Sequence, residues 1–343
     1  MTTPGPVAEL LAALRHTLGP RWEYQNDGSR LTINHRYAGT PYRPARRPFD
    51  WADLLARLET AFAEVGIPRA PVLPLRWGRE TDLTISAVQA LDPYVKHRKP
   101  YVYREGYLPQ PVVRFTGLRD ESGQLRDSFL TSFVNTSHVR RVTGPADIAT
   151  MLDQWLTVLS RLGLHARHIG FHARLSVWQR HPVAGLTLHF DHAGIPLGDL
   201  VWIWNQADPT YTVGDLGSGL ERLAWTITRR PWAQLVFGPL AAHADSTTLD
   251  LLRSGTLIAG SGIAPAARGP GAALRRILRS VSPHLVVRGL DAVVDIFYLY
   301  WRLTATLVSS AGEVSRNLRQ RAEPRGAYMH SAQSRVASQP QAC

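Results

Sequence analysis

Three strand-like segments in the middle of the chain constrain its fold more than any other feature. Residues 168–178, 185–191 and 199–205 are rich in aromatic and β-branched side chains, and glycine or proline residues lie between them. Short runs of this composition between turn residues are typical of consecutive strands. The sequence therefore predicts a mainly antiparallel sheet at the centre of the fold.

Further strands and flanking helices are predicted around this core. Strand-like pieces occur at 81–87 and 110–116, and residues 128–143 alternate bulky and small side chains as a pair of strands would. Apolar side chains recur at i, i+3 and i+4 in three segments, which indicates amphipathic helices. These segments are residues 6–18, 51–65 and 146–162. Thr143 or Asp147 is available to cap the third helix.

The pattern changes after Asp245, where helices joined by glycine and proline replace strands. The predicted helices are residues 246–254, 269–281 and 289–310, and a further helix at 217–228 precedes them. A chain of 343 residues is longer than most single domains. We expect an α+β fold with three parts, namely a sheet domain at 1–240, a smaller helical basic domain at 241–320 and a disordered polar tail at 321–343.

Positive charge is concentrated in the last third of the chain. The whole sequence has 39 basic and 27 acidic residues, and residues 251–343 contain 12 arginines against four acids. An excess of one sign in one region is what a phosphate backbone attracts, whereas a merely soluble surface mixes its charges. The charge therefore favours a nucleic-acid partner, and a plain solvated face is the alternative.

Several classes of protein are excluded by what the sequence lacks. The longest apolar stretch, 292–299, is far shorter than the ~20 residues of a membrane span. The first ten residues have no basic or apolar region of a secretory signal. The single cysteine, Cys343, argues against disulfides, thiolate metal sites and a cysteine nucleophile. We expect a soluble cytoplasmic protein with no membrane partner.

The segment DLGSGLERLA, from Asp215 to Ala224, is the sharpest local motif. It follows a predicted strand and opens a predicted helix. Gly217 and Gly219 would let a ligand approach the backbone without a Cβ in the way. Arg222 could offer its guanidinium fork to a phosphate. The alternative is a glycine-capped turn that begins an ordinary exposed helix.

This segment resembles motif 3 of the alanyl-tRNA synthetases, a group of class II aminoacyl-tRNA synthetases. Three other segments resemble parts of the same family, and all four occur in the family's order between about residues 75 and 285. They are PVVRFTGLR at 111–119, similar to the motif 2 strand, VWIWN at 201–205, similar to a Glu-Ile-Trp-Asn strand, and APAARGPGAALRRILRS at 264–280, similar to the start of the tRNA-recognition domain. The resemblance implies a class II synthetase fold for the sheet domain.

The resemblance also implies a nucleotide site. Arg119 would be the motif 2 arginine, which contacts the α-phosphate of ATP and the carboxylate of the amino acid. Arg222 would be the motif 3 arginine at the γ-phosphate. Gly217 and Gly219 would form the floor of the pocket, and Glu221 would belong to the ATP site. Arginine clamps of this kind offset the negative charge that builds up when a carboxylate attacks a phosphate.

The amino-acid side of the implied site involves three other residues. Asp215 would hold the α-ammonium of the amino acid, since an unpaired carboxylate selects a free amine. Asn205 would orient the carboxylate end. Trp204 could line the pocket, with core packing, the more frequent role of tryptophan, as the alternative. The resemblance implies Mg²⁺ to neutralise the pyrophosphate leaving group.

The chain departs from the family pattern at several positions. A Cys- and Glu-containing stretch is replaced by residues 181–192, where Asp191 could stand in for the glutamate as a magnesium-facing carboxylate. Residues 130–135 contain no glutamate, and Leu216 and Ser218 replace the usual motif 3 residues. His189, Asp191 and His192 lack a third ligand on one face, so a polar pocket wall is favoured over a zinc site.

The resemblance extends to RNA recognition. It implies that the helical domain binds a tRNA acceptor stem, with Arg268, Arg275, Arg276 and Arg279 as the contacting residues, and no DNA partner is expected. The expected function is activation of an amino acid, alanine or a small or unusual one, by ATP and its transfer to tRNA. The small size favours an editing-free form, and we expect it to be dedicated to a biosynthetic pathway. The alternatives are transfer to a carrier protein or small amine, and an inactive RNA-binding or regulatory protein.

Overall fold

The computed structural model describes residues 5–39, 41–44, 48–76, 83–100, 105–115, 119–281 and 289–322. The chain divides into two compact units. Unit 1 contains residues 1–118 and 126–238, and unit 2 contains residues 119–125 and 239–343. The sequence placed the boundary between the sheet domain and the helical domain at residue 240, and it assigned the short segment 119–125 to the sheet domain.

In its described part, unit 1 is built on a nine-stranded sheet whose pairs are all antiparallel. The strand order is β1-β2-β5-β7-β8-β9-β4-β3, and β6 pairs with β7 beside this path. The strands are β1 (Trp22–Asn26), β2 (Arg30–His35), β3 (Gly106–Val113), β4 (Ser132–Arg141), β5 (Ile169–Arg174), β6 (Trp178–Arg180), β7 (Val183–His192), β8 (Ile195–Asn205) and β9 (Thr212–Gly219). This confirms the predicted mainly antiparallel sheet.

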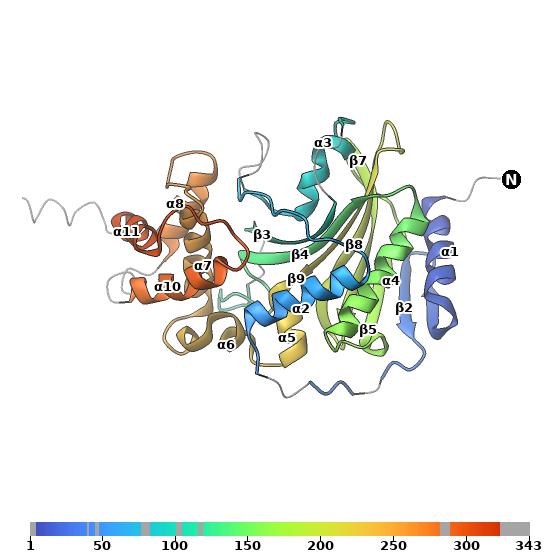
Figure 1. Ribbon diagram of the computed structural model, residues 1–343, viewed down its shortest axis with the longest axis horizontal. Helices are drawn as coiled ribbons and strands as arrows, with labels where there is room; N and C mark the ends of the chain where they lie inside the picture. Colours follow the sequence, from blue (N-terminus) through green and yellow to red (C-terminus); the bar gives the residue numbers. More distant parts are fainter. Residues whose placement is uncertain are drawn as a thin grey trace, which may run out of the picture. The chain divides into compact units, whose positions relative to one another are not determined.

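Helices cover one face of this sheet. Figure 1 shows α2 and α4 against the sheet. The helices of unit 1 are α1 (Pro6–Leu18), α2 (Trp51–Glu64), α3 (Asp92–Val95), α4 (Pro145–Arg161), α5 (Leu220–Thr228) and α6 (Trp232–Phe237), with 3₁₀ turns η1 (Gly19–Arg21), η2 (Ala87–Leu91) and η3 (Ala166–His168). The rings of Phe62, Trp155 and Phe190 join α2, α4 and β7 in one aromatic cluster. The predicted helices α1, α2 and α4 are thereby confirmed within one residue of their ends.

The opposite face of the sheet is only partly covered. The segment of η2 and α3 contributes Ala87, Leu91 and Val95 to a buried cluster with Val139 and Val213 on the sheet. Side chains alternate between the faces of a strand. Gly214, for example, faces Met151 and Ile148 of α4, so its neighbours on β9 point to the other face. That face carries the cavity described below.

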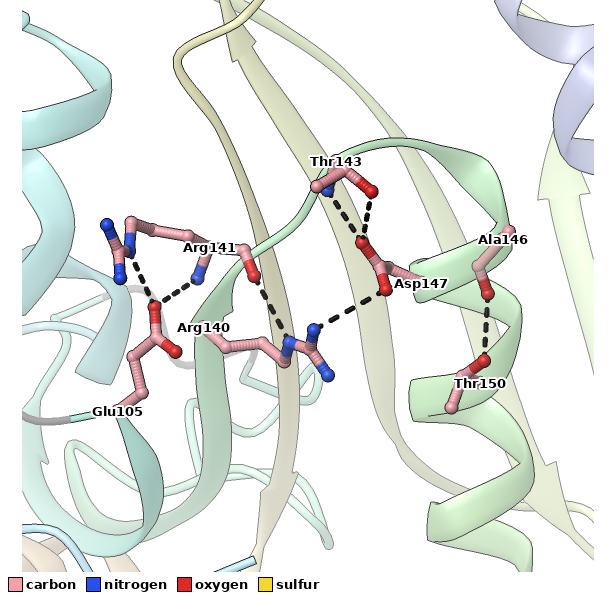
Figure 2. Close-up of polar contacts among 7 residues, drawn as sticks. All are labelled: Glu105, Arg140, Arg141, Thr143, Ala146, Asp147 and Thr150. Carbon is pink, nitrogen blue, oxygen red and sulfur yellow. Dashed lines mark hydrogen bonds and ion pairs between the residues drawn. The ribbon is translucent and has the colours of Figure 1, made fainter.

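The connection from β4 to α4 is fixed by a polar network (Figure 2). The Asp147 carboxylate accepts hydrogen bonds from the backbone N–H and the hydroxyl of Thr143, both at 2.7 Å, and pairs with Arg140 at 3.4 Å. Arg141 pairs with Glu105 at 2.9 Å. The N-cap of α4 is Gly144 without a side-chain cap, so Asp147 ties the helix to the strand and does not cap it as an N-cap residue would.

Unit 2 is helical in its described part. Its helices are α7 (Ser246–Gly260), α8 (Pro270–Ser280), α10 (Leu290–Trp301) and α11 (Ala311–Ala322), and the 3₁₀ turn η4 (Gly238–Ala242) leads into them. Arg253 of α7 is buried, with its guanidinium 4.6 Å from the ring of Tyr300 and 4.4 Å from that of Trp301. Segment 119–125 joins this unit through Thr247, whose hydroxyl oxygen accepts hydrogen bonds from Arg119 and from the backbone of Leu125.

Four local predictions were wrong. The described part of 81–87 contains no strand, because Ser86 and Gln89 form a capping box that starts η2. Residues 128–143 form one strand, β4, and not a pair. The helix expected at 217 begins only at Leu220, since Gly217 and Gly219 remain in β9. The helix expected at 289–310 ends at Trp301, and α11 follows.

The predicted tail at 321–343 overlaps α11 in its first two residues. Residues 323–343 lie outside the described part of the chain. No helix in the described residues is long and apolar enough to cross a membrane.

Candidate active site

A cavity of about 190 Å³ lies in unit 1 on the sheet face away from α4. Strands β4, β8 and β9 form its floor, and the start of α5 and the segments around 86, 114 and 128–130 form its walls. Its lining residues are Ser86, Arg114, Ser128, Phe129, Leu130, Phe133, Asn135, Leu197, Gly198, Asp199, Asp215, Gly217, Ser218, Gly219, Glu221, Arg222 and Trp232. Five of them are charged, and four of these, Arg114, Asp199, Asp215 and Arg222, are considered first.

Asp215 is the most deeply buried of these charged groups. Its side chain is on β9, and the residue is 8% exposed. Oδ2 accepts a weak hydrogen bond from the Ser86 hydroxyl at 3.5 Å, and Oδ1 is buried with no hydrogen-bond partner in the described part of the chain. Burial, together with the nearby Asp199 carboxylate, raises the pKa of Asp215 to about 7, although Arg114 opposes the rise. An orphaned buried carboxylate of this kind lacks a cation that a ligand could supply.

Two arginines in the cavity are anchored in the same way. The Nε of Arg114 donates to the backbone oxygen of Ile85, and the guanidinium lies 5.1 Å from the ring of Phe133. The Nε of Arg222 donates to the backbone oxygen of Ser128 at 3.1 Å, and the guanidinium lies 5.6 Å from the ring of Phe129.

This anchoring affects what the two guanidinium groups can bind. Burial lowers the pKa of Arg114 and of Arg222, while the Asp199 carboxylate opposes the decrease at both. No hydrogen bond within the described residues occupies the Nη groups of either arginine. Two oriented guanidinium forks with free Nη groups are suited to bind phosphate or carboxylate oxygens.

Asp199 lies among the other three charged residues. It pairs with Gly217 across β8 and β9, and the next pair on the same face is Val201 with Asp215. Partial burial raises the pKa of Asp199, against the lowering effects of His189, Arg114 and Arg222. The cavity therefore combines two carboxylates with two guanidiniums, which is a site for a ligand that carries both an ammonium and anionic groups.

Glycines allow the strands under this site to approach closely. A Cβ on Gly198 would collide with the backbone oxygen of Gly217, and a Cβ on Gly217 would meet Oδ1 of Asn135 at 3.1 Å. A Cβ on Gly219 would meet only the Arg222 side chain, at 3.6 Å and beyond. Close contacts therefore restrict Gly198 and Gly217 to glycine or to a local shift, whereas space alone does not require glycine at Gly219.

Five residues predicted for the site line the cavity. They are Asp215, Gly217, Gly219, Glu221 and Arg222. The Glu221 carboxylate, however, accepts hydrogen bonds from the backbone N–H of Val134 at 3.2 and 3.3 Å and is 1% exposed. It joins α5 to β4.

Four other predicted residues do not line the cavity. Arg119 belongs to unit 2, where it donates to the Gly123 oxygen and to Thr247. The Asn205 amide is buried and donates to the backbone oxygens of Val95 and Lys96. Asn205 ends β8, and the adjacent Trp204 packs against Trp202 with 5.0 Å between ring centroids.

Asp191 is the fourth of these residues. Its Oδ1 accepts the Gly194 N–H at 3.1 Å and closes the turn between β7 and β8. Within the described residues, no three His, Cys, Asp or Glu side chains are grouped so that they could hold a metal ion. Asp191 is thus not placed to bind a magnesium ion in the cavity.

Sequence analysis missed Arg114, Asp199 and Asn135. Arg114 lies inside the segment that resembles motif 2, five residues before Arg119, and follows β3 directly. Asp199 is the only acidic residue in β8. An acidic residue within an otherwise apolar strand could have indicated a site residue from the sequence alone.

The arginines predicted to contact tRNA are on or beside α8. Arg268, Arg275, Arg276 and Arg279 are exposed, whereas Leu274, Ile277 and Leu278 on the same helix are buried. The helix thus packs one apolar face into unit 2 and presents a basic face to solvent.

Comparison with known proteins adds a distant relationship. No protein-family model matches the chain. It is 25% identical over 232 residues to an alanine–tRNA ligase of Methanococcus maripaludis, which covers 62% of this chain and 25% of that protein. It is 27% identical over 231 residues to an alanine–tRNA ligase of Cenarchaeum symbiosum, which covers 63% of this chain and 25% of that protein. The chain spans about a quarter of the length of these curated relatives, and over that part it is distantly related to alanine–tRNA ligases.

Proposed function

We propose that the protein activates an amino acid with ATP and transfers the aminoacyl group to tRNA. The observation that carries the proposal is the cavity itself, in which the buried carboxylate of Asp215, whose Oδ1 has no hydrogen-bond partner among the described residues, lies near two anchored arginines, Arg114 and Arg222. The relationship to alanine–tRNA ligases supports the same reaction class. We assign the class II fold and the tRNA-recognition role of unit 2 as parts of this proposal.

The residues divide the chemistry between them. Asp215 binds the α-ammonium of the amino acid. Arg114 and Arg222 bind the phosphates of ATP, so the amino-acid carboxylate is placed for in-line attack on the α-phosphate. Attack forms the aminoacyl adenylate and releases pyrophosphate, and the guanidiniums stabilise the charge that develops on the phosphate oxygens. Mg²⁺ would arrive bound to ATP, and no residue here is assigned to it.

The direct test is amino-acid-dependent exchange of pyrophosphate into ATP, with MgATP and each common amino acid in turn and without tRNA. We expect exchange with one or a few small amino acids. The exchange reports adenylate formation alone, so it does not depend on the acceptor. Absence of exchange with every amino acid, in a sample that also fails to bind ATP, would reject the activation reaction and leave an RNA-binding or regulatory role.

The basic face of α8 provides a separate test of the tRNA partner. Arg275 and Arg279 lie one turn apart on α8 and are exposed. Charge reversal of both should weaken tRNA binding about tenfold or more and lower the slope of log affinity against log salt by roughly one to two. The matched control is Arg180→Glu, an exposed arginine in unit 1. Equal loss in both variants would contradict a specific role for α8, and no tRNA binding by the wild type at low salt would indicate another acceptor.

A further inference from the structure

A row of polar side chains crosses the sheet beside the cavity. The strand register places His172 of β5 opposite His189 of β7, His189 opposite Asp199 of β8, and Asp199 opposite Gly217 of β9. Directly paired residues share a face of the sheet. His172 and His189 therefore lie on the cavity face, one and two strands beyond Asp199.

Contacts within this row orient the imidazole of His189. Its Nδ1 lies 3.8 Å from Oδ2 of Asp199, and its ring stacks on that of His172 with 5.4 Å between centroids and 26° between planes. The His189 side chain is 50% exposed and that of Asp199 is 44% exposed. Burial and the neighbouring His189 lower the pKa of His172, although Asp191 opposes this, so His172 supplies a neutral stacking surface. Half of the His189 side chain is exposed to solvent.

The position of Asp199 locates the reacting centre relative to this row. Asp199 interacts electrostatically with Asp215, Arg114 and Arg222. In the proposed reaction, the ammonium is at Asp215 and the phosphates are at the two arginines. The activated carbonyl carbon joins these two ends, so it lies near Asp199. His189 is the next residue across the sheet from Asp199, and its side chain is half exposed.

We propose that His189, oriented by Asp199, is the general base for the acceptor in the transfer half-reaction. This rests on the proposed function. The acceptor hydroxyl attacks the adenylate carbonyl, and a C–O bond forms as the bond between the carbonyl carbon and the phosphate oxygen breaks. AMP leaves with that electron pair, and the hydroxyl proton passes to Nε2 of His189. Asp199 is a positioning residue that holds the Nδ1–H tautomer, as the carboxylate does in other His-dependent sites.

The transfer step can be measured separately from activation. Enzyme-bound adenylate is formed first, and AMP release is then followed in a single turnover after addition of unfractionated tRNA or, in a parallel arm, glycinamide. In the wild type we expect at least one of these acceptors to accelerate AMP release. His189→Ala should slow that acceleration roughly 10²-fold or more, the usual contribution of a general base. His16→Ala, an exposed histidine on α1, is the matched control.

Two further readouts separate catalysis from a structural role. The pH profile of transfer should differ between His189→Ala and the wild type, because a general base must be deprotonated to accept the proton. Added imidazole should restore transfer in His189→Gly, because it can occupy the vacated space and accept the proton. Asp199→Asn should slow transfer and respond less to imidazole.

The possible outcomes are distinguishable. If the protein catalyses pyrophosphate exchange but neither acceptor accelerates AMP release, then the acceptor does not bind beside His172, His189 and Asp199, and the proposal is overturned. Transfer by His189→Ala at the wild-type rate, or a slow variant with an unchanged pH profile and no imidazole rescue, would overturn the role of His189. Failure of exchange in the wild type would instead reject the proposed function itself.

Discussion

Replacement of Asp215 with Asn is expected to make the protein more stable and nearly inactive in amino-acid activation. The buried carboxylate binds the substrate ammonium in the proposed reaction. Its Oδ1 has no hydrogen-bond partner among the described residues and is therefore free to accept one from the ammonium. Removal of one partner of a buried charged pair costs about 2–5 kcal/mol. Pyrophosphate exchange should therefore fall about 10²–10³-fold in kcat/KM for the amino acid.

The stability effect has a defined sign and pH range. The pKa of Asp215 is raised from 3.8 to about 7 in the folded protein, so between these values the folded state binds more protons than the unfolded state. The free energy of unfolding therefore decreases as pH rises from 4 to 7, by at most about 4 kcal/mol for this group. Asp215→Asn removes this cost. The variant should gain roughly 1–4 kcal/mol over the wild type at pH 8 and nothing at pH 4.

Denaturant unfolding at pH 4 and pH 8 measures this difference directly. In the wild type, the KM for the amino acid should also rise as the pH falls below 7, since a protonated Asp215 does not attract an ammonium. Asp191→Asn is a matched control, because Asp191 is also an aspartate on the sheet but lies outside the cavity. A stability gain that is equal at both pH values would show that the Asp215 carboxylate is not destabilised by burial.

Replacement of Arg114 with Ala should reduce the rate of adenylate formation about 10²–10³-fold, the usual loss when one preorganised donor to a developing negative charge is removed. The Nε of Arg114 is held by Ile85 and its guanidinium lies over Phe133, so the fork is fixed before ATP binds. Arg114→Lys keeps a charge without the planar fork and should recover only part of the rate.

Arg119→Ala is the informative control for this variant. The resemblance to motif 2 assigns the ATP contact to Arg119, whereas the arginine of this segment that lines the cavity is Arg114. If Arg114 binds the nucleotide, exchange by Arg119→Ala should stay close to the wild-type rate. The reverse result, with loss in Arg119→Ala and retention in Arg114→Ala, would refute the role of Arg114. Circular dichroism and thermal unfolding of both variants check that each is folded.

Local patterns predicted most of the fold but not where strands end. Helices α1, α2 and α4 and strands β7 and β8 have strong apolar periodicity, and the sequence located them well. Gly217 and Gly219 were expected at the start of a helix, yet both lie in β9 because β9 pairs with β8 on one side and β4 on the other. These partners are distant in sequence, and pairing of this kind overrides the weak strand preference of glycine.

The difference between local patterns and long-range strand pairing also explains which site residues could be predicted. Asp215 and Arg222 belong to one continuous motif, so local reading located them. The choice between Arg114 and Arg119 depends on where β3 ends, and pairing of Val113 with Ser132 sets that end. Asn205 was expected to face a substrate, but its side-chain amide donates a hydrogen bond to the backbone oxygen of Lys96, about a hundred residues earlier.

Segment 119–125 has a consequence for how the protein can be divided. These seven residues interrupt unit 1 in sequence but belong to unit 2, so the chain passes between the units at three points. A fragment cut after Gly238 would still contain Arg119 and Leu125 but would lack Thr247, to which both donate hydrogen bonds. Unit 2 expressed alone would lack this segment. The two units are therefore not modules that gene fusion or fission could exchange at a single junction, and they must be inherited and engineered as a pair.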